Sequence, residues 1–176
     1  FDVVAKIKPS VVGIGIHTPT SRPQNILRGT GFVIGDGHYV ITNAHVLPTE
    51  LDDSLLQKMA VFVGSGKTAK VRHAQIIATS NLYDLAILKI SGSPLPAKML
   101  KRMRNPYVAY QLDATAYPGN SGSAMYDMKT GEVLGVINKV FVQSTKEAVI
   151  STPSGITYAI PVKYLHKILK ENNIKL

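Results

Sequence analysis

The sequence predicts an all-β protein that ends in one helix, and three observations support this prediction. Short segments rich in β-branched residues follow one another along the chain, with turn residues between them. No long helical pattern separates these segments. Such a pattern appears only near the end, in VKYLHKILKENN, where the apolar residues Val162, Leu165, Ile168 and Leu169 have the spacing of one helix face. With 176 residues, 45% of them hydrophobic, the chain can bury a large core.

The first half is expected to form a closed antiparallel barrel. The sequence GDG at 35–37 is a strong hairpin signal, and PTELDDSLLQK at 48–58 is expected to contain a helical turn. Successive strands without long helices favour closure, because a closed barrel leaves no unpaired edge. Six strands are expected: Ser10–His17, Gly29–Gly35, His38–Asn43, Met59–Gly64, Lys70–Thr79 and Asp84–Ile90.

The second half is expected to contain fewer strands and then the helix. The sequence KTG at 129–131 indicates a turn between the second and third of these strands. Four strands are expected here: Tyr107–Asp113, Ser123–Asp127, Glu132–Val142 and Ile156–Val162.

Composition excludes several kinds of chemistry. The chain has no cysteine, so disulfides, thiolate metal sites and a cysteine nucleophile are excluded. The histidines at positions 17, 38, 73 and 166 lack metal-ligand spacing, and no phosphate loop or dinucleotide motif is present. We therefore expect no cofactor and no metal. No apolar run reaches the roughly 18–20 residues of a membrane span.

The net charge of +9 raises the alternative of a module that docks on nucleic acid or on an anionic membrane. The basic residues are mostly scattered, with clusters at 101–104 and 163–175, and no basic stripe interleaved with aromatic residues appears. This pattern favours a solvated basic surface over a nucleic-acid site.

A glycine-rich corner, YPGNSGSAMYD, presents Ser121 between Gly119 and Gly122. A serine hydroxyl is a weak nucleophile, so it needs an imidazole to accept its proton and a carboxylate to orient that imidazole. His45, just after the third strand, and Asp84, at the start of the sixth, are the candidates. The flanking glycines free backbone N–H groups to bind the oxyanion that forms during acyl transfer.

Each of these residues also has an ordinary structural interpretation. A single histidine after a strand, an aspartate at the start of one and a serine in a turn are common surface features. Their joint occurrence, in the order His, Asp, Ser and each in a specific local context, indicates a catalytic triad.

Three motifs together, GTGFVIGDGHYVITNAHVL, DLAILKI and GNSGSAM, resemble the chymotrypsin-fold serine proteases and, within them, the trypsin-like domain of the HtrA/Deg proteases. VAKIKPSVVGI and GITYAIPVKYL also match, so the resemblance covers nearly the whole chain. It implies two antiparallel six-stranded β-barrels, at 1–95 and 96–176, with the active site between them. It also implies His45 as general base, Asp84 as its orienting carboxylate, and Ser121 as nucleophile. The oxyanion hole would be the corner of Gly119, Asn120 and Ser121.

The sequence departs from the family pattern at the corner and in the pocket. Ser123 and Ala124 replace the usual Gly-Pro, as Ser does in the glutamyl-endopeptidase relatives. Thr115 stands six residues before Ser121, where an acidic residue would select Arg or Lys. The expected substrate pocket would fit a small or medium apolar side chain. The residues assigned to it are Thr115, Val136, Ile137 and Asn138.

A larger departure is length. Ser121 follows Asp84 by only 37 positions, and two strands of the second barrel are missing near 98–104. Either the sequence omits residues there, or the second barrel is reduced and the triad does not assemble. We favour the first explanation, since a half-barrel would expose strand edges.

The expected function is that of a serine endopeptidase acting on unfolded or exposed polypeptide segments. The alternative is a catalytically inactive protease-fold scaffold or peptide-binding module. The resemblance further implies protein quality control, a homotrimer, and a periplasmic, secreted or organellar location. No PDZ domain is expected within these 176 residues.

Overall fold

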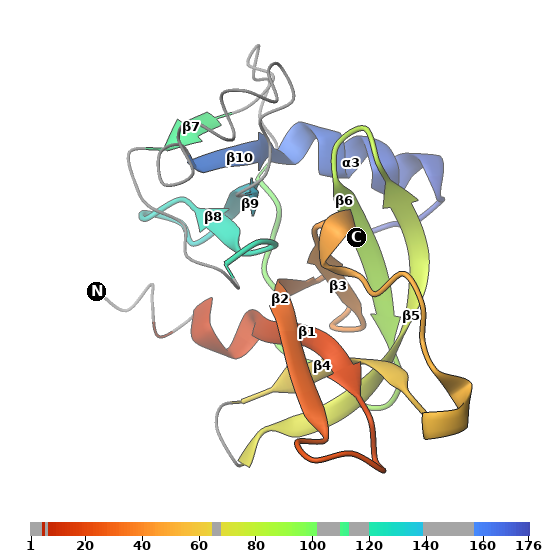
Figure 1. The fold of residues 1–176 in the computed structure, drawn as a ribbon. Coiled ribbons are helices and arrows are strands. Elements are labelled where there is room, and N and C mark those ends of the chain that lie inside the picture. The colour runs from red at the N-terminus through yellow and green to blue at the C-terminus, as the bar shows by residue number, and fades with distance from the viewer. Residues whose placement is uncertain (1–4, 6, 65–67, 102–109, 113–119, 139–156) are drawn as a thin grey trace.

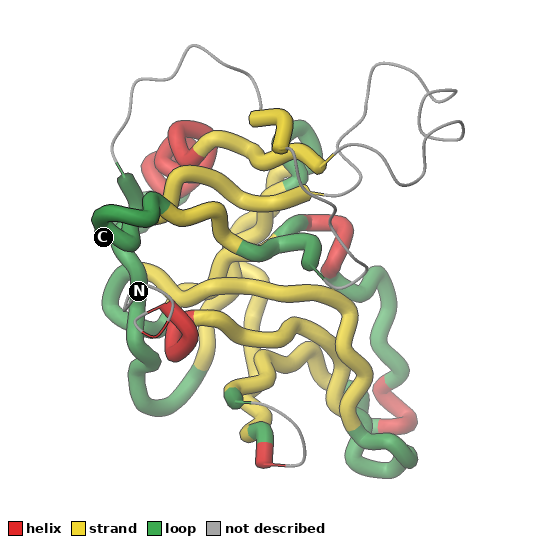
Figure 2. The backbone as a smooth tube through the Cα atoms, turned by 90° about the vertical axis from the view of Figure 1, so that its left-hand side faces the viewer, coloured by secondary structure: helices red, strands yellow, loops and turns green. Residues whose placement is uncertain are grey.

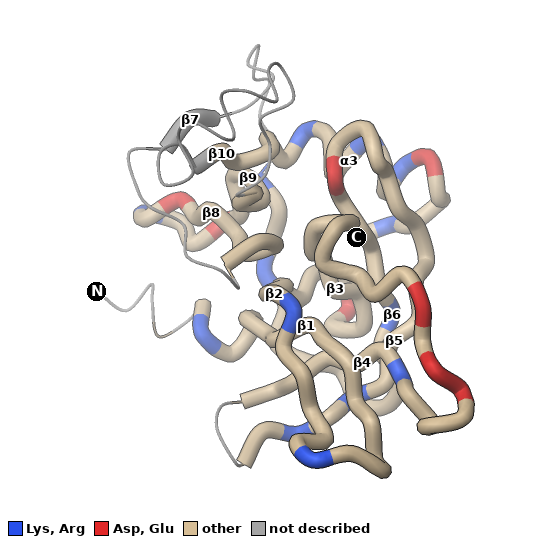
Figure 3. The backbone as a smooth tube through the Cα atoms, in the orientation of Figure 1, with Lys and Arg blue, Asp and Glu red and all other residues tan. Residues whose placement is uncertain are grey.

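The computed structural model describes residue 5 and residues 7–64, 68–101, 110–112, 120–138 and 157–176. These residues form a closed barrel with a second sheet and a helix packed on it (Figure 1). Among them, no helix is long and apolar enough to cross a membrane. Lys and Arg are spread over both parts of the molecule and do not form one stripe (Figure 3).

The barrel confirms the six predicted strands of the first half. The strands pair antiparallel in the order β1-β2-β3-β6-β5-β4, and the barrel closes between β4 and β1. The GDG turn joins β2 to β3, with positive φ at both glycines. β2 begins four residues earlier than predicted. The bounds are β1 (Val11–His17), β2 (Asn25–Ile34), β3 (Tyr39–Thr42), β4 (Lys58–Val63), β5 (Lys70–Ser80) and β6 (Leu85–Ile90).

Short 3-10 helices connect the barrel strands. η1 (Lys8–Ser10) precedes β1, η2 (Ala44–Val46) follows β3, and η3 (Asp53–Leu55) lies where a helical turn was predicted. The Asp52 carboxylate accepts a hydrogen bond from the Ser54 N–H and so caps η3.

The second half forms a four-stranded sheet in the order β7-β10-β9-β8, followed by the predicted C-terminal helix. A second six-stranded barrel was predicted, and the described residues form these four strands of it. The stretch 98–101 runs from the barrel to the sheet, bridging Ile34 to Lys98 and Leu100 to Val133, and residues 102–109 lie outside the described part. The bounds are β7 (Tyr110–Leu112), β8 (Ala124–Tyr126), β9 (Val133–Asn138), β10 (Thr157–Pro161) and α3 (Val162–Glu171).

Strand alternation in the barrel builds two separate cores. Val33, Val40 and Leu88 point into the barrel, where they pack with residues of β1 and β4. Their neighbours Phe32 and Ile87 point out of the barrel and are nevertheless fully buried. The second half covers this outer face with Leu100, Val133, Val136, Ile160, Val162, Leu165, Ile168 and Leu169. Figure 2 shows the second sheet and α3 stacked on one side of the barrel in this way.

Candidate active site

His45 lies on η2, and the backbone of this short helix is tied to Asp84. The N–H of Ala44 and the side-chain amide of Asn43 both donate to the Asp84 carbonyl, at 3.2 and 3.0 Å. The His45 N–H donates to Asp84 Oδ1 at 2.8 Å. These hydrogen bonds fix the turn with His45 to the turn with Asp84 independently of the contact between the imidazole and the carboxylate.

Asp84 holds an unusual backbone conformation, with φ of +53°. Aspartate tolerates this left-handed region better than most residues. It ends the turn that leads into β6, and β6 pairs with β3 directly below η2. β3, which leads to His45, and β6, which follows Asp84, are thus neighbours in the barrel.

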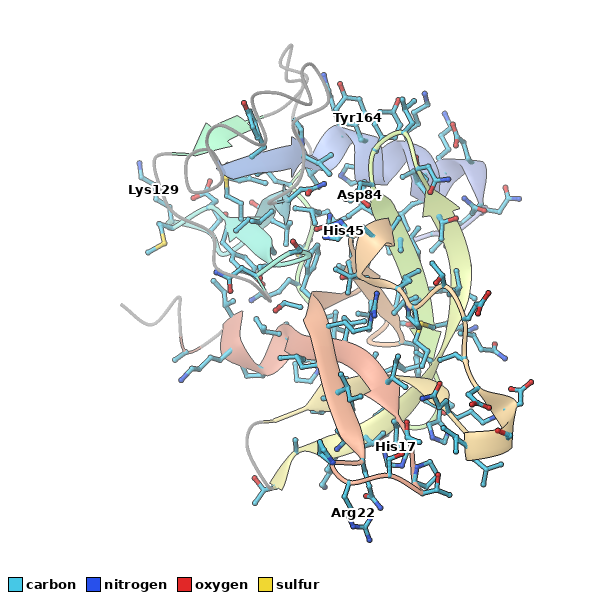
Figure 4. All side chains as sticks on the ribbon, viewed as in Figure 1. His17, Arg22, His45, Asp84, Lys129 and Tyr164 are labelled. Atoms are coloured by element: carbon cyan, nitrogen blue, oxygen red, sulfur yellow. The ribbon has the colours of Figure 1, made fainter. Side chains whose placement is uncertain are left out.

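The imidazole of His45 meets the carboxylate of Asp84. Nδ1 lies 2.5 Å from Asp84 Oδ2, and Figure 4 shows the two side chains side by side where the barrel meets the second half. An ionised carboxylate only accepts hydrogen bonds, so Nδ1 must carry the proton. Nε2 is then left with a lone pair, which is the state that a general base needs. The His45 side chain is 37% exposed, so substrate can reach it.

Asn138 is the site residue whose position sequence reasoning missed. It was assigned to the substrate pocket, but its amide Nδ2 donates to Asp84 Oδ2 at 2.6 Å, and the residue is 1% exposed. The hydrogen bond comes from β9, in the second half of the chain. The available signal was a polar amide at the end of an apolar strand, because a buried amide must find a partner.

Ser121 is buried and lies in a corner fixed to both halves of the molecule. Its carbonyl accepts a hydrogen bond from the Thr30 N–H of β2 at 3.0 Å. Gly122 has φ of +95°, and a Cβ there would lie 2.0 Å from the Thr30 carbonyl oxygen, so only glycine fits. The Gly122 N–H donates to the Ile137 carbonyl at 3.0 Å, which ties the corner to β9.

The remaining predicted residues divide into described and undescribed ones. Asn120 is exposed next to Ser121, Val136 is fully buried, and Ile137 is half-buried. Gly119 and Thr115 lie outside the described residues. The oxyanion hole and the apolar pocket therefore stay predictions. Within the described ranges, no three His, Asp or Glu side chains gather as metal ligands.

The closed barrel, the sheet packed against it and the His–Asp pair between them define a protein of the trypsin-like fold. A family model described as "Trypsin-like peptidase domain" matches residues 29–109. The serine endoprotease from Yersinia pestis has a similar fold, with a TM-score of 0.71 and 24% identity over 97% of this chain and 65% of that one.

The chain is also similar to curated proteins described as DegP-like. A probable periplasmic serine endoprotease, DegP-like, of Brucella suis is 30% identical over 166 residues, covering 77% of this chain and 31% of the relative. The protein of the same description from Halomonas elongata is 26% identical, covering 76% and 32%. This chain thus spans about a third of the length of these relatives. The chain has the trypsin-like fold and is similar over most of its length to these DegP-like proteins.

Proposed function

We propose that this chain is a serine endopeptidase with His45, Asp84 and Ser121 as its catalytic triad. The observation that carries the proposal is the hydrogen bond from His45 Nδ1 to Asp84 Oδ2, which leaves Nε2 free to accept a proton. The hydrogen bond that ties the Ser121 corner to β2, next to η2, supports Ser121 as the third residue of the triad.

In the proposed reaction, His45 Nε2 takes the proton of Ser121 Oγ while that oxygen attacks the carbonyl carbon of a peptide bond. The resulting oxyanion is stabilised by the backbone N–H groups of Gly119 and Ser121. The imidazolium then gives its proton to the leaving amine as the C–N bond breaks. Water, activated by the same imidazole, hydrolyses the acyl-enzyme and restores the serine.

The substrates would be polypeptides, as the word endoprotease in the names of the relatives indicates. Those relatives are also named periplasmic, which supports an extracytoplasmic location for this chain. We further propose that it acts in protein quality control on unfolded or exposed segments, as a homotrimer.

The test is covalent labelling with a fluorophosphonate, followed by intact-mass measurement and a digestion assay with denatured casein. The wild-type chain should gain one adduct and cleave the casein. Ser121→Ala should do neither, while Ser123→Ala, two residues further along the same corner, should do both. A folded wild-type chain that takes no adduct would instead be an inactive scaffold or peptide-binding module, and an adduct on Ser121→Ala would contradict the triad.

A further inference from the structure

β2 contains a β-bulge whose extra residue is Arg28. Along the β1–β2 pair, Ile14 faces Gly29 and the next residue, Gly15, faces Leu27, so Arg28 has no partner residue on β1. A bulge of this kind redirects the side chain that it carries, because the local strand bends and twists.

The redirected side chain reaches the helix that carries His45. Arg28 Nε donates to the Val46 carbonyl at 2.7 Å, and Nη2 donates to the Leu47 carbonyl at 3.5 Å. The last carbonyls of a helix have no partner within the helix, so they need donors from elsewhere. Asp84 therefore holds the beginning of η2, and Arg28 holds its end.

The next two residues of β2, Gly29 and Thr30, contact the corner that carries Ser121. A Cβ on Gly29 would lie 2.7 Å from a methyl group of Val46 and 3.0 Å from the Ser121 carbonyl oxygen. The next N–H, that of Thr30, donates to this Ser121 oxygen. Residues 28–30 of β2 thus contact both the end of the helix that carries His45 and the backbone of Ser121.

We propose that Arg28 is a positioning residue, which fixes the distance between the His45 imidazole and the Ser121 hydroxyl through the end of η2. This inference rests on the proposed peptidase function. Arg28 touches no reacting atom and acts through the carbonyls of Val46 and Leu47. Since a misplacement of about 1 Å can cost about a hundredfold in rate, a loosened η2 should lower turnover.

The test compares Arg28→Met, which keeps the aliphatic stem and loses every donor, with a matched control, Arg72→Met. Arg72 also donates from its guanidinium to loop carbonyls, those of Ser91 and Ser93, but between β5 and the loop after β6. Arg28→Met should lower kcat on a fluorogenic peptide by about tenfold to a hundredfold. Its KM should stay within about twofold, as expected when substrate binding is untouched. Arg28→Lys should give an intermediate kcat, since its ammonium can still bind one carbonyl.

A second measurement does not depend on activity. The proton between His45 and Asp84 should give a downfield proton NMR signal, which Arg28→Met should broaden and Arg72→Met should leave unchanged. Thermal melts show whether each variant is folded, and Arg28→Lys carries the comparison if Arg28→Met does not fold. Unchanged kcat and signal in the Arg28 variants, or equal losses in Arg72→Met, would overturn the inference. A wild-type chain that takes no fluorophosphonate would contradict the proposed function, while the NMR comparison would still decide the role of Arg28.

Discussion

The two halves of the chain bury the apolar face of their sheets in different ways. The first half closes its six strands into a barrel with an interior of its own, whereas β8, β9 and β10 of the second half pack apolar side chains on the outside of that barrel. The site residues divide in the same way. His45 and Asp84 are fixed to each other within the barrel, while Asn138 contacts Asp84 and the Ser121 corner contacts β2 only because the second half is docked. The barrel therefore carries the proposed base, and the docked second half carries the proposed nucleophile.

The largest expected effect comes from changing the carboxylate that both halves share. Asp84→Asn should lower kcat/KM by about 10⁴-fold, because an amide at this place favours the wrong imidazole tautomer. Peptide hydrolysis by the purified variant, with circular dichroism to confirm its fold, measures this. An unchanged rate would mean that Asp84 only joins two turns of the barrel.

The next effect separates the two cores. Leu165→Ala on α3 and Leu88→Ala inside the barrel remove the same fully buried side chain, and each should cost about 2–5 kcal/mol in unfolding free energy. Native-state hydrogen exchange should show Leu165→Ala raising exchange in β9 and β10 while the barrel amides stay protected. Leu88→Ala should raise exchange in both halves. Equal patterns for the two variants would show that the halves unfold as one unit.

A smaller effect tests which half orients the carboxylate. Asn138→Ala removes a donor to the Asp84 side chain, whereas Asn43→Ala removes a donor to the Asp84 backbone carbonyl. Both amides are buried, so each change should cost about 1–3 kcal/mol of stability. Turnover should fall about tenfold or more in Asn138→Ala and less in Asn43→Ala, because the N–H groups of Ala44 and His45 still tie η2 to Asp84. Equal turnover in the two variants would remove the second half from the orientation of Asp84.

The smallest effect concerns an ion pair confined to the second half. Lys101 Nζ lies 2.5 Å from Asp127 Oδ2, and this hydrogen bond lowers the pKa of the Asp127 carboxyl below its usual value of 3.8. A lowered folded-state pKa gives stability that is present above the usual value and is lost as the pH falls below it. The urea midpoint should therefore drop between pH 7 and pH 3, and less so in Lys101→Met. Lys129→Met, on the same turn, is the control and should keep the wild-type pH dependence, because only the Lys129 backbone N–H contacts Asp127.

Sequence reasoning succeeded where local signals decide the structure. Segments rich in β-branched residues, turn glycines and helical spacing predicted the barrel, the turn at 129–131 and α3, since each depends on residues close together in the chain. The pairing of His45 with Asp84 was predicted because His, Asp and Ser occur together in that order, each in a specific local context. The amide of Asn138 and the guanidinium of Arg28 could not be placed in this way, because their partners lie 54 and 18 positions away. Only the docking of the two halves and the bulge in β2 decide where these two side chains point.

The hydrogen bond from Thr30 to Ser121 also has a consequence for the timing of synthesis. A ribosome completes β2 long before it adds Ser121, so the Thr30 N–H has no Ser121 carbonyl to bind until the second half has been made. Until the second half docks, a nascent chain of the proposed peptidase carries a base and a carboxylate without a positioned nucleophile. Newly made molecules would then be unable to digest one another while they are still folding.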